Sequence, residues 1–158
     1  EIEIASKTFE IIVPSTNAPC IMDALAAVTS LSNCLCRRIV ISTGTHFIRE
    51  FREVHMSDGA SLEIIGKDPK PTLVFGSSCG LAFQCAAPSS GKLSNVCFVS
   101  EHSPPRQPTE RPSLLEFRSG CWSVENCTFE NRNGCGVSVS GPSTSVDIRA
   151  SHFCDVKQ

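Results

Sequence analysis

The chain has 158 residues, 41% of them hydrophobic, which fits a single domain, residues 1–158, with a core of its own. Its formal net charge of −2 argues against a general nucleic-acid binder, and no stretch reaches the ~18 apolar residues that a membrane span needs. No signal peptide opens the chain, and its first residue is Glu1 rather than Met, so we expect a fragment of a larger intracellular protein.

The first two predicted elements are a strand and a helix. Lys7–Pro14 is rich in β-branched residues and ends at a proline, which predicts a strand. Residues 18–32 change to a helical period, with Pro19 placed to open the helix. Its apolar face contains Ile21, Ala24, Leu25, Val28 and Leu31. We expect this amphipathic helix to cap the N-terminal end of the core, since no feature supports the alternative of a cofactor-binding helix.

Short strands separated by turns are predicted along the rest of the chain. Their ranges are 39–41, 47–48, 54–56, 61–66, 72–75, 80–85, 114–117, 122–124, 137–139 and 146–148. Glycines at positions 120, 134, 136 and 141 mark corners where we expect positive φ angles.

Three segments, residues 91–98, 122–129 and 146–153, share one pattern. Leu93 aligns with Val124, 31 residues later, and with Ile148, and a fainter copy places Leu62 31 residues before Leu93. The pattern also aligns Phe98, Phe129 and Phe153, places Asn95 beside Asn126, and matches Trp122 with Gly91 and Val146. Period-2 strands at such spacing indicate a solenoid, in which each turn is buried by stacking on the next. We expect the asparagines to satisfy corner backbone groups and Trp122 to face the interior, a sugar-stacking platform being the alternative for Trp122.

Ten cysteines are many for this length. Cys97, Cys127 and Cys154 fall inside the strand repeats, where a small apolar side chain suits a stacked core. We expect reduced, structural cysteines, with disulfides and a metal site as the alternatives. The spacing Cys34-x-Cys36 is too short for the usual zinc ligand pair, and the four histidines form no cluster. No metal and no cofactor is therefore expected.

Residues 100–112 contain four prolines and almost no apolar side chain. Because proline has no N–H to donate, this segment cannot lie in a strand ladder and should loop out between two turns. It is either a tolerated insertion or an arm that contacts a partner. As such an arm it would offer His102, Arg106 and Arg111 as candidate binding residues.

Longer motifs resemble a known family. Ile39–His46 followed by Leu62–Gly66 resembles the opening of right-handed parallel β-helices of the pectin-lyase-like, CASH type. Ser113–Phe129, Gly136–Val139 and Ser145–Phe153 resemble the turns of the subgroup that holds the Shc-binding, midbody-associated proteins and the β-helical F-box proteins. The resemblance covers about residues 36–155. It implies a non-catalytic recognition module, serving cytoskeletal scaffolding in one branch and substrate capture for ubiquitin ligation in the other.

Pectin-acting enzymes share this fold, so the aligned positions need a test for catalysis. Lyases need clustered acids and a strand-borne base, and hydrolases need carboxylates within ~5–10 Å of each other. The expected column beside the buried row holds Glu63, Ser94, Glu125 and Arg149, without adjacent carboxylates. We expect Glu125 and Arg149 to form an ion pair between turns. His152 neighbours Thr128, and Asp147 neighbours Ser123 without a histidine, so we expect no enzyme.

The sequence thus predicts an all-β fold, a right-handed single-stranded parallel β-helix of about five turns with an N-terminal capping α-helix. Its expected function is non-catalytic recognition of a protein partner through a flat sheet face or the proline-rich loop, in a cytoplasmic, cytoskeletal or nuclear protein. Carbohydrate binding or cleavage is the alternative, for which the nine Phe, one Trp and absence of Tyr leave few outward-facing aromatic residues. Self-association through an open C-terminal turn is a third hypothesis.

Overall fold

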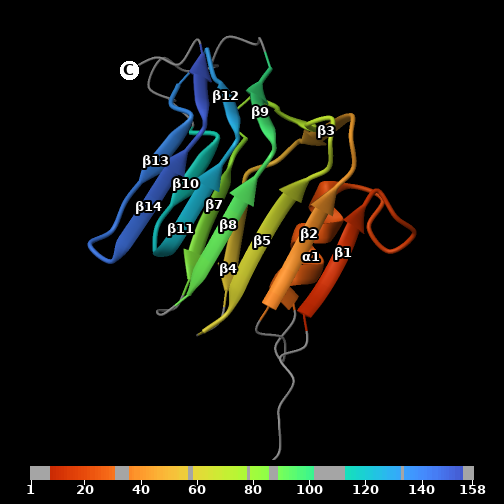
Figure 1. Ribbon diagram of the computed structural model, residues 1–158, viewed down its shortest axis with the longest axis horizontal. Helices are drawn as coiled ribbons and strands as arrows, with labels where there is room; N and C mark the ends of the chain where they lie inside the picture. Colours follow the sequence, from red (N-terminus) through yellow and green to blue (C-terminus); the bar gives the residue numbers. More distant parts are fainter. Residues whose placement is uncertain are drawn as a thin grey trace, which may run out of the picture.

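The structure, a computed structural model, describes residues 8–30, 36–56, 59–77, 79–85, 89–101, 113–132 and 134–154. Every strand pairing among them is parallel, and the strands form three sheets around one core (Figure 1). The all-β parallel β-helix expected from the sequence is confirmed.

Each turn of the chain contributes one strand to each sheet. Sheet A has six strands in the order β1 (Thr8–Val13), β2 (Cys36–Ile41), β5 (Ser61–Gly66), β8 (Ser90–Ser94), β11 (Gly120–Glu125) and β14 (Thr144–Arg149). Sheet B has five: β3 (Thr45–Ile48), β6 (Thr72–Phe75), β9 (Cys97–Ser100), β12 (Thr128–Glu130) and β15 (His152–Cys154). Sheet C has four: β4 (Arg52–Met56), β7 (Leu81–Cys85), β10 (Leu115–Phe117) and β13 (Val137–Val139). The turns beginning at β2, β5, β8 and β11 are complete, and β14 with β15 adds part of a fifth.

The predicted columns of the core are confirmed downstream of β8. Val124 pairs with Leu93 on one side and Ile148 on the other. In sheet B, the ring of Phe129 stacks between those of Phe98 and Phe153, with centroids 5.0 and 4.8 Å away. The two successive turns differ in length, but Phe98, Phe129 and Phe153 each follow the aliphatic residue of sheet A by five positions, which brings equivalent side chains to the same place in each turn.

The predicted upstream copy is wrong in register. Leu62 pairs with Gly91, and Ile64 rather than Leu62 pairs with Leu93. A shift of two residues leaves every side chain on the same face of the strand, so the alternation in the sequence is equally compatible with both registers. As a result Glu63 lies beside Lys92, not in the same row as Ser94 and Glu125.

Trp122 lies in the core, as predicted, with 3% of its surface exposed. Its indole N–H donates to the carbonyl of Ser119 at 2.8 Å, and its ring packs against Phe83 at 4.8 Å. A Cβ atom at Gly91 on the neighbouring strand would overlap this ring, so the absence of a side chain there makes room for the indole.

The corner between sheets A and B contains the predicted asparagine ladder. Asn95 and Asn126 have φ angles of 57° and 51°, and Asn126 Nδ2 donates to Asn95 Oδ1 at 2.9 Å. Asn95 Nδ2 in turn donates to the Gly66 carbonyl at 2.9 Å. Gly120 and Gly141 also have the expected positive φ angles, whereas Gly136 does not, and it packs instead against Phe129 and Phe153.

The capping helix α1 (Ile21–Ser30) begins three residues later than in the predicted range 18–32, of which residues 31 and 32 lie outside the described residues. It begins after Cys20, whose amide N–H donates to Asp23 Oδ2 at 3.2 Å, so the first turn is closed by its own carboxylate. Its predicted core residues Ile21, Ala24, Leu25 and Val28 are buried, and Leu31 lies outside the described residues. The helix packs against β1 to β4 and covers that end of the core, opposite β13 to β15 (Figure 1).

The eight cysteines whose side chains are described are free thiols. Burial raises the pKa of the Cys127 and Cys97 thiols, which keeps them protonated at neutral pH. Both therefore act as small apolar side chains, Cys127 inside the core and Cys97 on a strand of sheet B.

Candidate functional site

The three sheets present outer faces of different character. On sheet A one row across all six strands reads Glu10, Arg38, Glu63, Lys92, Ser123 and Asp147. Arg38 bridges Glu10 at 3.3 Å and Glu63 at 2.8 Å. These alternating charges neutralise one another locally, so this face offers little net charge to a partner.

The predicted ion pair between Glu125 and Arg149 is wrong. The two residues are neighbours in the ladder, but Glu125 binds Lys92 at 3.1 Å and Arg149 binds Asp147 at 2.8 Å. Lys92 on β8 lies opposite Ser123 and reaches diagonally along the neighbouring strand to Glu125, two residues further on the same face of β11. Arg149 instead folds back to the residue two before it on the same face of its own strand.

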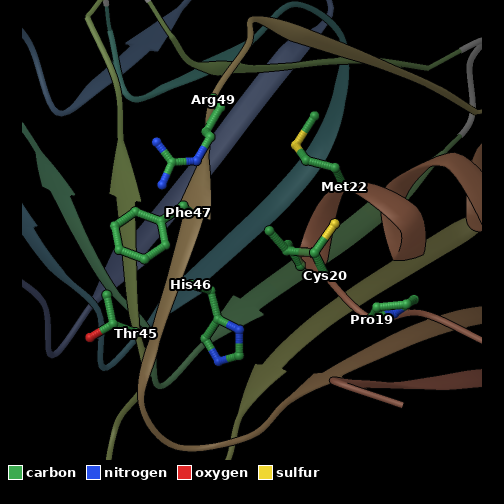
Figure 2. A pocket seen from close by; sticks show the side chains of 8 residues that line it. Pro19, Cys20, Met22, Thr45, His46, Phe47 and Arg49 are labelled. Atoms are coloured by element: carbon green, nitrogen blue, oxygen red, sulfur yellow. The ribbon is translucent and has the colours of Figure 1, made fainter. Parts of the chain in front are cut away.

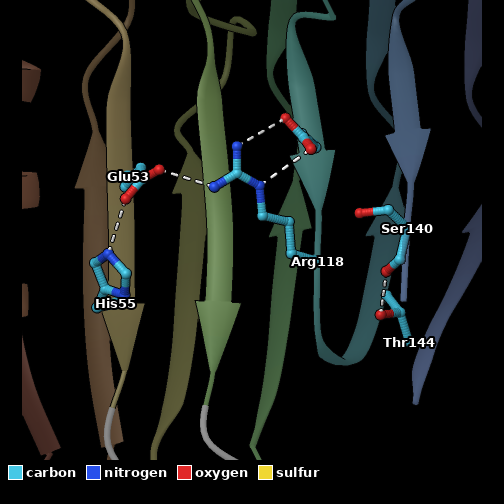
Figure 3. A network of polar contacts seen from close by, with 6 residues as sticks. Glu53, His55, Arg118, Ser140 and Thr144 are labelled. Carbon is cyan, nitrogen blue, oxygen red and sulfur yellow. Dashed lines mark hydrogen bonds and ion pairs between the residues drawn. The ribbon is translucent and has the colours of Figure 1, made fainter. Parts of the chain in front are cut away.

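The outer face of sheet C carries a network around Arg118 (Figure 3). Arg118 binds Glu53 on β4 at 2.8 Å and Glu116 on β10 at 3.0 Å, spanning β7, where the small side chain of Ala82 lies between the two carboxylates. His55 contacts Glu53 at 3.1 Å. Hydrogen bonds from Arg118 and then His55 lower the pKa of Glu53, which stays ionised. Through Arg118 the network links β4 and β10, which belong to different turns of the β-helix.

The rows considered for catalysis hold no complete catalytic set among the described residues. Ser123 lies beside Asp147, and His152 beside Thr128, as predicted. The Nε2 atom of His46 contacts the Ser42 carbonyl, and that of His55 contacts Glu53. Neither of these nitrogens is therefore placed to activate Ser123. Within the described part of the chain no group of His, Cys, Asp and Glu is placed to hold a metal ion. The candidate loop residues His102, Arg106 and Arg111 lie outside the described residues.

The outer face of sheet B differs from the other two because it is almost uncharged. Its first row contains Thr45, Thr72, Cys97, Thr128 and His152, and its second contains Phe47, Val74, Val99, Glu130 and Cys154. On β6, β9 and β12 these residues alternate with buried side chains, and the register carries the same outward facing to β3 and β15. We call these ten residues the sheet B face. A surface without charges that must be stripped of water is well suited to lie at the centre of a contact.

A pocket of about 360 Å³ adjoins this face where β3 meets the start of α1 (Figure 2). It is lined by Thr45, His46, Phe47 and Arg49 on the strand side and by Pro19, Cys20, Ile21 and Met22 on the helix side. We call it the β3 pocket. The Arg49 guanidinium lies over the Phe47 ring, 4.7 Å from its centroid.

No sequence prediction pointed to the β3 pocket. Alternation around the buried Ile48 places Phe47 on the outer face, and this signal was present in the sequence. That the start of a helix faces this strand follows only from the stacking of turns, because residues 19–22 and 45–49 belong to different elements.

No family model, curated protein or solved structure matches the chain. The assignment as a parallel β-helix therefore depends on the pairing of its strands. Among the described residues, no helix combines the length and apolar character that crossing a bilayer requires.

Proposed function

We propose that this domain is a non-catalytic protein-recognition module and that the sheet B face is the centre of its contact surface. The observation that supports this most directly is the contrast between faces. Sheets A and C carry ion pairs on their outer faces, whereas Glu130 is the single Asp, Glu, Lys or Arg among the ten residues of the sheet B face. A partner that covers this surface would disturb the ion pair between Glu130 and Arg132, at 3.8 Å, and the contact of Lys70 with Thr128, at 3.5 Å, instead of the charge networks found on the other two sheets.

The dimensions of the sheet B face fit the centre of an interface rather than a whole one. Five strands of up to four residues give a strip of ~19 by ~13 Å, or ~250 Å². A partner in a stable complex usually covers about 800 Å² on each side. The remaining contacts would come from neighbouring segments, and the β3 pocket is the described feature that continues the strip.

The carbohydrate alternative needs open aromatic rings for sugars to stack on. Phe47 and Phe51 are 44% and 48% exposed, but Arg49 lies over the first ring and Arg118 over the second. Phe153 stacks on Phe129 at the end of the core. These arrangements favour a protein partner over a glycan.

The finer family assignment is part of the same proposal. The motifs in Ser113–Phe129 and Ser145–Phe153 resemble the pectin-lyase-like, CASH-type β-helices of the Shc-binding and F-box proteins. On that resemblance we place the domain inside the cell, as a scaffold associated with the cytoskeleton or with a ubiquitin ligase.

The experiment compares capture of proteins by variants with a charge on different sheets. Val74→Lys and Val99→Lys place lysines in the middle of the sheet B face, and Val40→Lys places one on the outer face of sheet A as a matched control, all three valines being half-buried. The tagged chain and each variant capture proteins from a cell lysate, and mass spectrometry quantifies them. We expect partners retained by Val40→Lys and depleted at least tenfold by the other two.

A glycan array run with the same four proteins tests the alternative function. Binding of defined glycans, without any protein that distinguishes Val74→Lys from Val40→Lys, would contradict the proposed function. Circular dichroism of each variant checks that the depletion does not come from unfolding.

A further inference from the structure

We infer that the free edge of β3 binds an extended peptide of a partner protein as an added strand, with an acidic side chain of that peptide on Arg49. This inference rests on the proposed role in protein recognition and names its binding site. Adding a strand to an exposed sheet edge is a recurring mode of peptide recognition, in which main-chain hydrogen bonds provide affinity and pockets provide specificity.

Among the described residues, no strand pairs with the β3 edge of sheet B. Sheet A begins with β1, which lies one level before β2, but sheet B begins directly with β3. At the corresponding level of sheet B the chain runs through Pro19–Met22 into α1 and forms the wall of the β3 pocket. The pocket therefore lies where the counterpart of β1 would be found in sheet B (Figure 2).

The hydrogen bonds of β3 show which backbone groups face this vacant level. The amide of Thr72 on β6 donates to the Gly44 carbonyl, and the amide of Gly76 donates to the Ile48 carbonyl, both at 2.9 Å. In a parallel ladder alternate residues bond to opposite sides. With Thr45 opposite Thr72, the N–H and C=O groups of Thr45 and Phe47 point away from β6, toward the pocket.

Those groups have no hydrogen-bonding partner among the described residues, and α1 packs beside β3 without bonding to them. Both residues are exposed, so solvent occupies this edge when no peptide is bound. A peptide of four or five residues would satisfy the four groups at once, as β1 does for β2.

The positive charge of Arg49, at the end of the β3 edge, indicates which kind of peptide binds there. Arg49 forms no ion pair with any carboxylate of the described residues, in contrast to Arg38, Arg52, Arg118 and Arg149. Its contact is the ring of Phe47. Behind the other wall, in the first turn of α1, Asp23 accepts the Cys20 amide N–H. The opposite wall also contains the flexible thioether of Met22, which can adapt to an apolar side chain. The geometry thus favours a peptide in which an apolar residue enters the pocket and an Asp or Glu reaches Arg49.

The test selects peptides from a phage-displayed library of random twelve-residue sequences and measures the best synthetic peptide by fluorescence anisotropy. We expect the selected sequences to alternate apolar and polar residues and to contain Asp or Glu. Arg49→Gln should weaken binding at least about tenfold, because it removes a charge-assisted contact. Arg149→Gln, an exposed arginine of sheet A, is the matched control and should bind as the wild type does.

A second pair of variants separates the backbone from the side chain. Phe47→Pro removes an N–H that points away from β6, so the ladder between β3 and β6 stays complete. Phe47→Val removes the ring and keeps the N–H. We expect Phe47→Pro to bind about tenfold more weakly than Phe47→Val. Hydrogen exchange of the Thr45 and Phe47 amides in the wild type should slow when the peptide is bound.

Failure of this inference and failure of the proposed function give different results. A library that yields no peptide, or peptides that bind Arg49→Gln normally and leave both amides unprotected, overturns the β3 site. If the peptides that bind Arg49→Gln normally do not bind Val74→Lys, the proposed function of the sheet B face stands without the β3 site. If peptides protect the two amides and are retained by Val74→Lys and Val99→Lys, the β3 site stands and the sheet B face is not the centre of the contact. Should Phe47→Pro fail to fold, Arg49→Gln and the amide exchange decide the outcome.

Discussion

On the inner face of sheet A the Trp122 ring lies directly against Gly91 of the neighbouring strand. Gly91→Ala should lower the free energy of unfolding by about 1–3 kcal/mol, because a methyl group there would overlap the indole and the surrounding rings leave it little room to move. Urea unfolding followed by circular dichroism measures the loss.

Two further variants identify the cause of that loss. Gly91→Ala combined with Trp122→Phe should recover part of the stability relative to the sum of the single changes, since the smaller ring leaves room for the methyl group. Gly76→Ala is a control, because a Cβ atom there would meet no atom closer than 3.4 Å. An equal loss in Gly76→Ala, or no recovery in the double variant, would show that the ring contact is not responsible.

The side chain of Glu53 predicts how stability depends on pH. Arg118 and His55 lower its pKa in the folded protein, so between the folded and unfolded pKa values the unfolded chain binds more protons. The stabilisation is complete above the unfolded value and disappears as pH falls through the folded one. Unfolding midpoints from neutral pH down to below pH 4 should therefore fall less steeply for Glu53→Gln than for the wild type. Arg118→Gln should show the same flattening, and an unchanged slope in both would contradict this assignment.

Among the elements, the corner between sheets A and B is the most regular turn. Asn95 and Asn126 occupy it in successive turns, but Ala150 occupies the next one with a φ of 48°. The left-handed region costs an alanine about 1–2 kcal/mol, and asparagine is the side chain that tolerates it best after glycine. The ladder thus ends at a strained residue.

Ala150→Asn should raise the free energy of unfolding by about 1 kcal/mol, because it relieves this strain and places an amide where it can donate to Asn126 Oδ1. Thermal unfolding measures the gain. Ala150→Gly relieves the strain without adding an amide. If asparagine stabilises no more than glycine does, the added rung of the ladder contributes nothing.

The elements also show what the sequence could predict. Alternation identified the strands, and the matching motifs around Leu93–Phe98 and Val124–Phe129 placed Val124 on Leu93 and Phe129 on Phe98, because each phenylalanine follows its aliphatic residue by the same five positions. The turn from β5 to β8 is two residues shorter than the turn from β8 to β11. Leu62 therefore stays on the inner face of its strand but pairs with a different residue. The face of the sheet on which a side chain lies follows from local alternation, whereas the register between strands depends on the length of the loop that joins them.

The β3 pocket could not be predicted for a related reason. The sequence predicts one wall of the pocket as the start of a capping helix and the other as a short strand, and neither pattern indicates a pocket. Only the topology reveals that sheet A has a strand one level before β2, whereas in the described part of the chain sheet B has none before β3.

At the scale of the whole molecule, the two ends of the β-helix differ. Helix α1 closes the core at one end, while β13, β14 and β15 form the opposite edge of the three sheets. At that edge Val139, Ile148 and Phe153 are 50%, 39% and 43% exposed, although the equivalent positions of the preceding turn, Phe117, Val124 and Phe129, are fully buried. Three apolar residues beside strand edges that pair with no other described strand form a surface that favours association.

This end should bind a second copy of the chain in a closed dimer. Head-to-tail stacking would bring it against α1, whose outer side carries Asp23, Ala26 and Ser30, so the three apolar side chains would meet a largely polar helix surface and open filaments are disfavoured. Sedimentation velocity across a range of concentrations should show a monomer–dimer equilibrium without larger species. Ile148→Lys should shift it toward monomer, and Ile12→Lys, an equally exposed isoleucine on β1 at the other end of sheet A, should leave it unchanged. A chain that stays monomeric at every concentration, or that dimerises equally as Ile148→Lys, would show that the exposed apolar end does not bring two copies together.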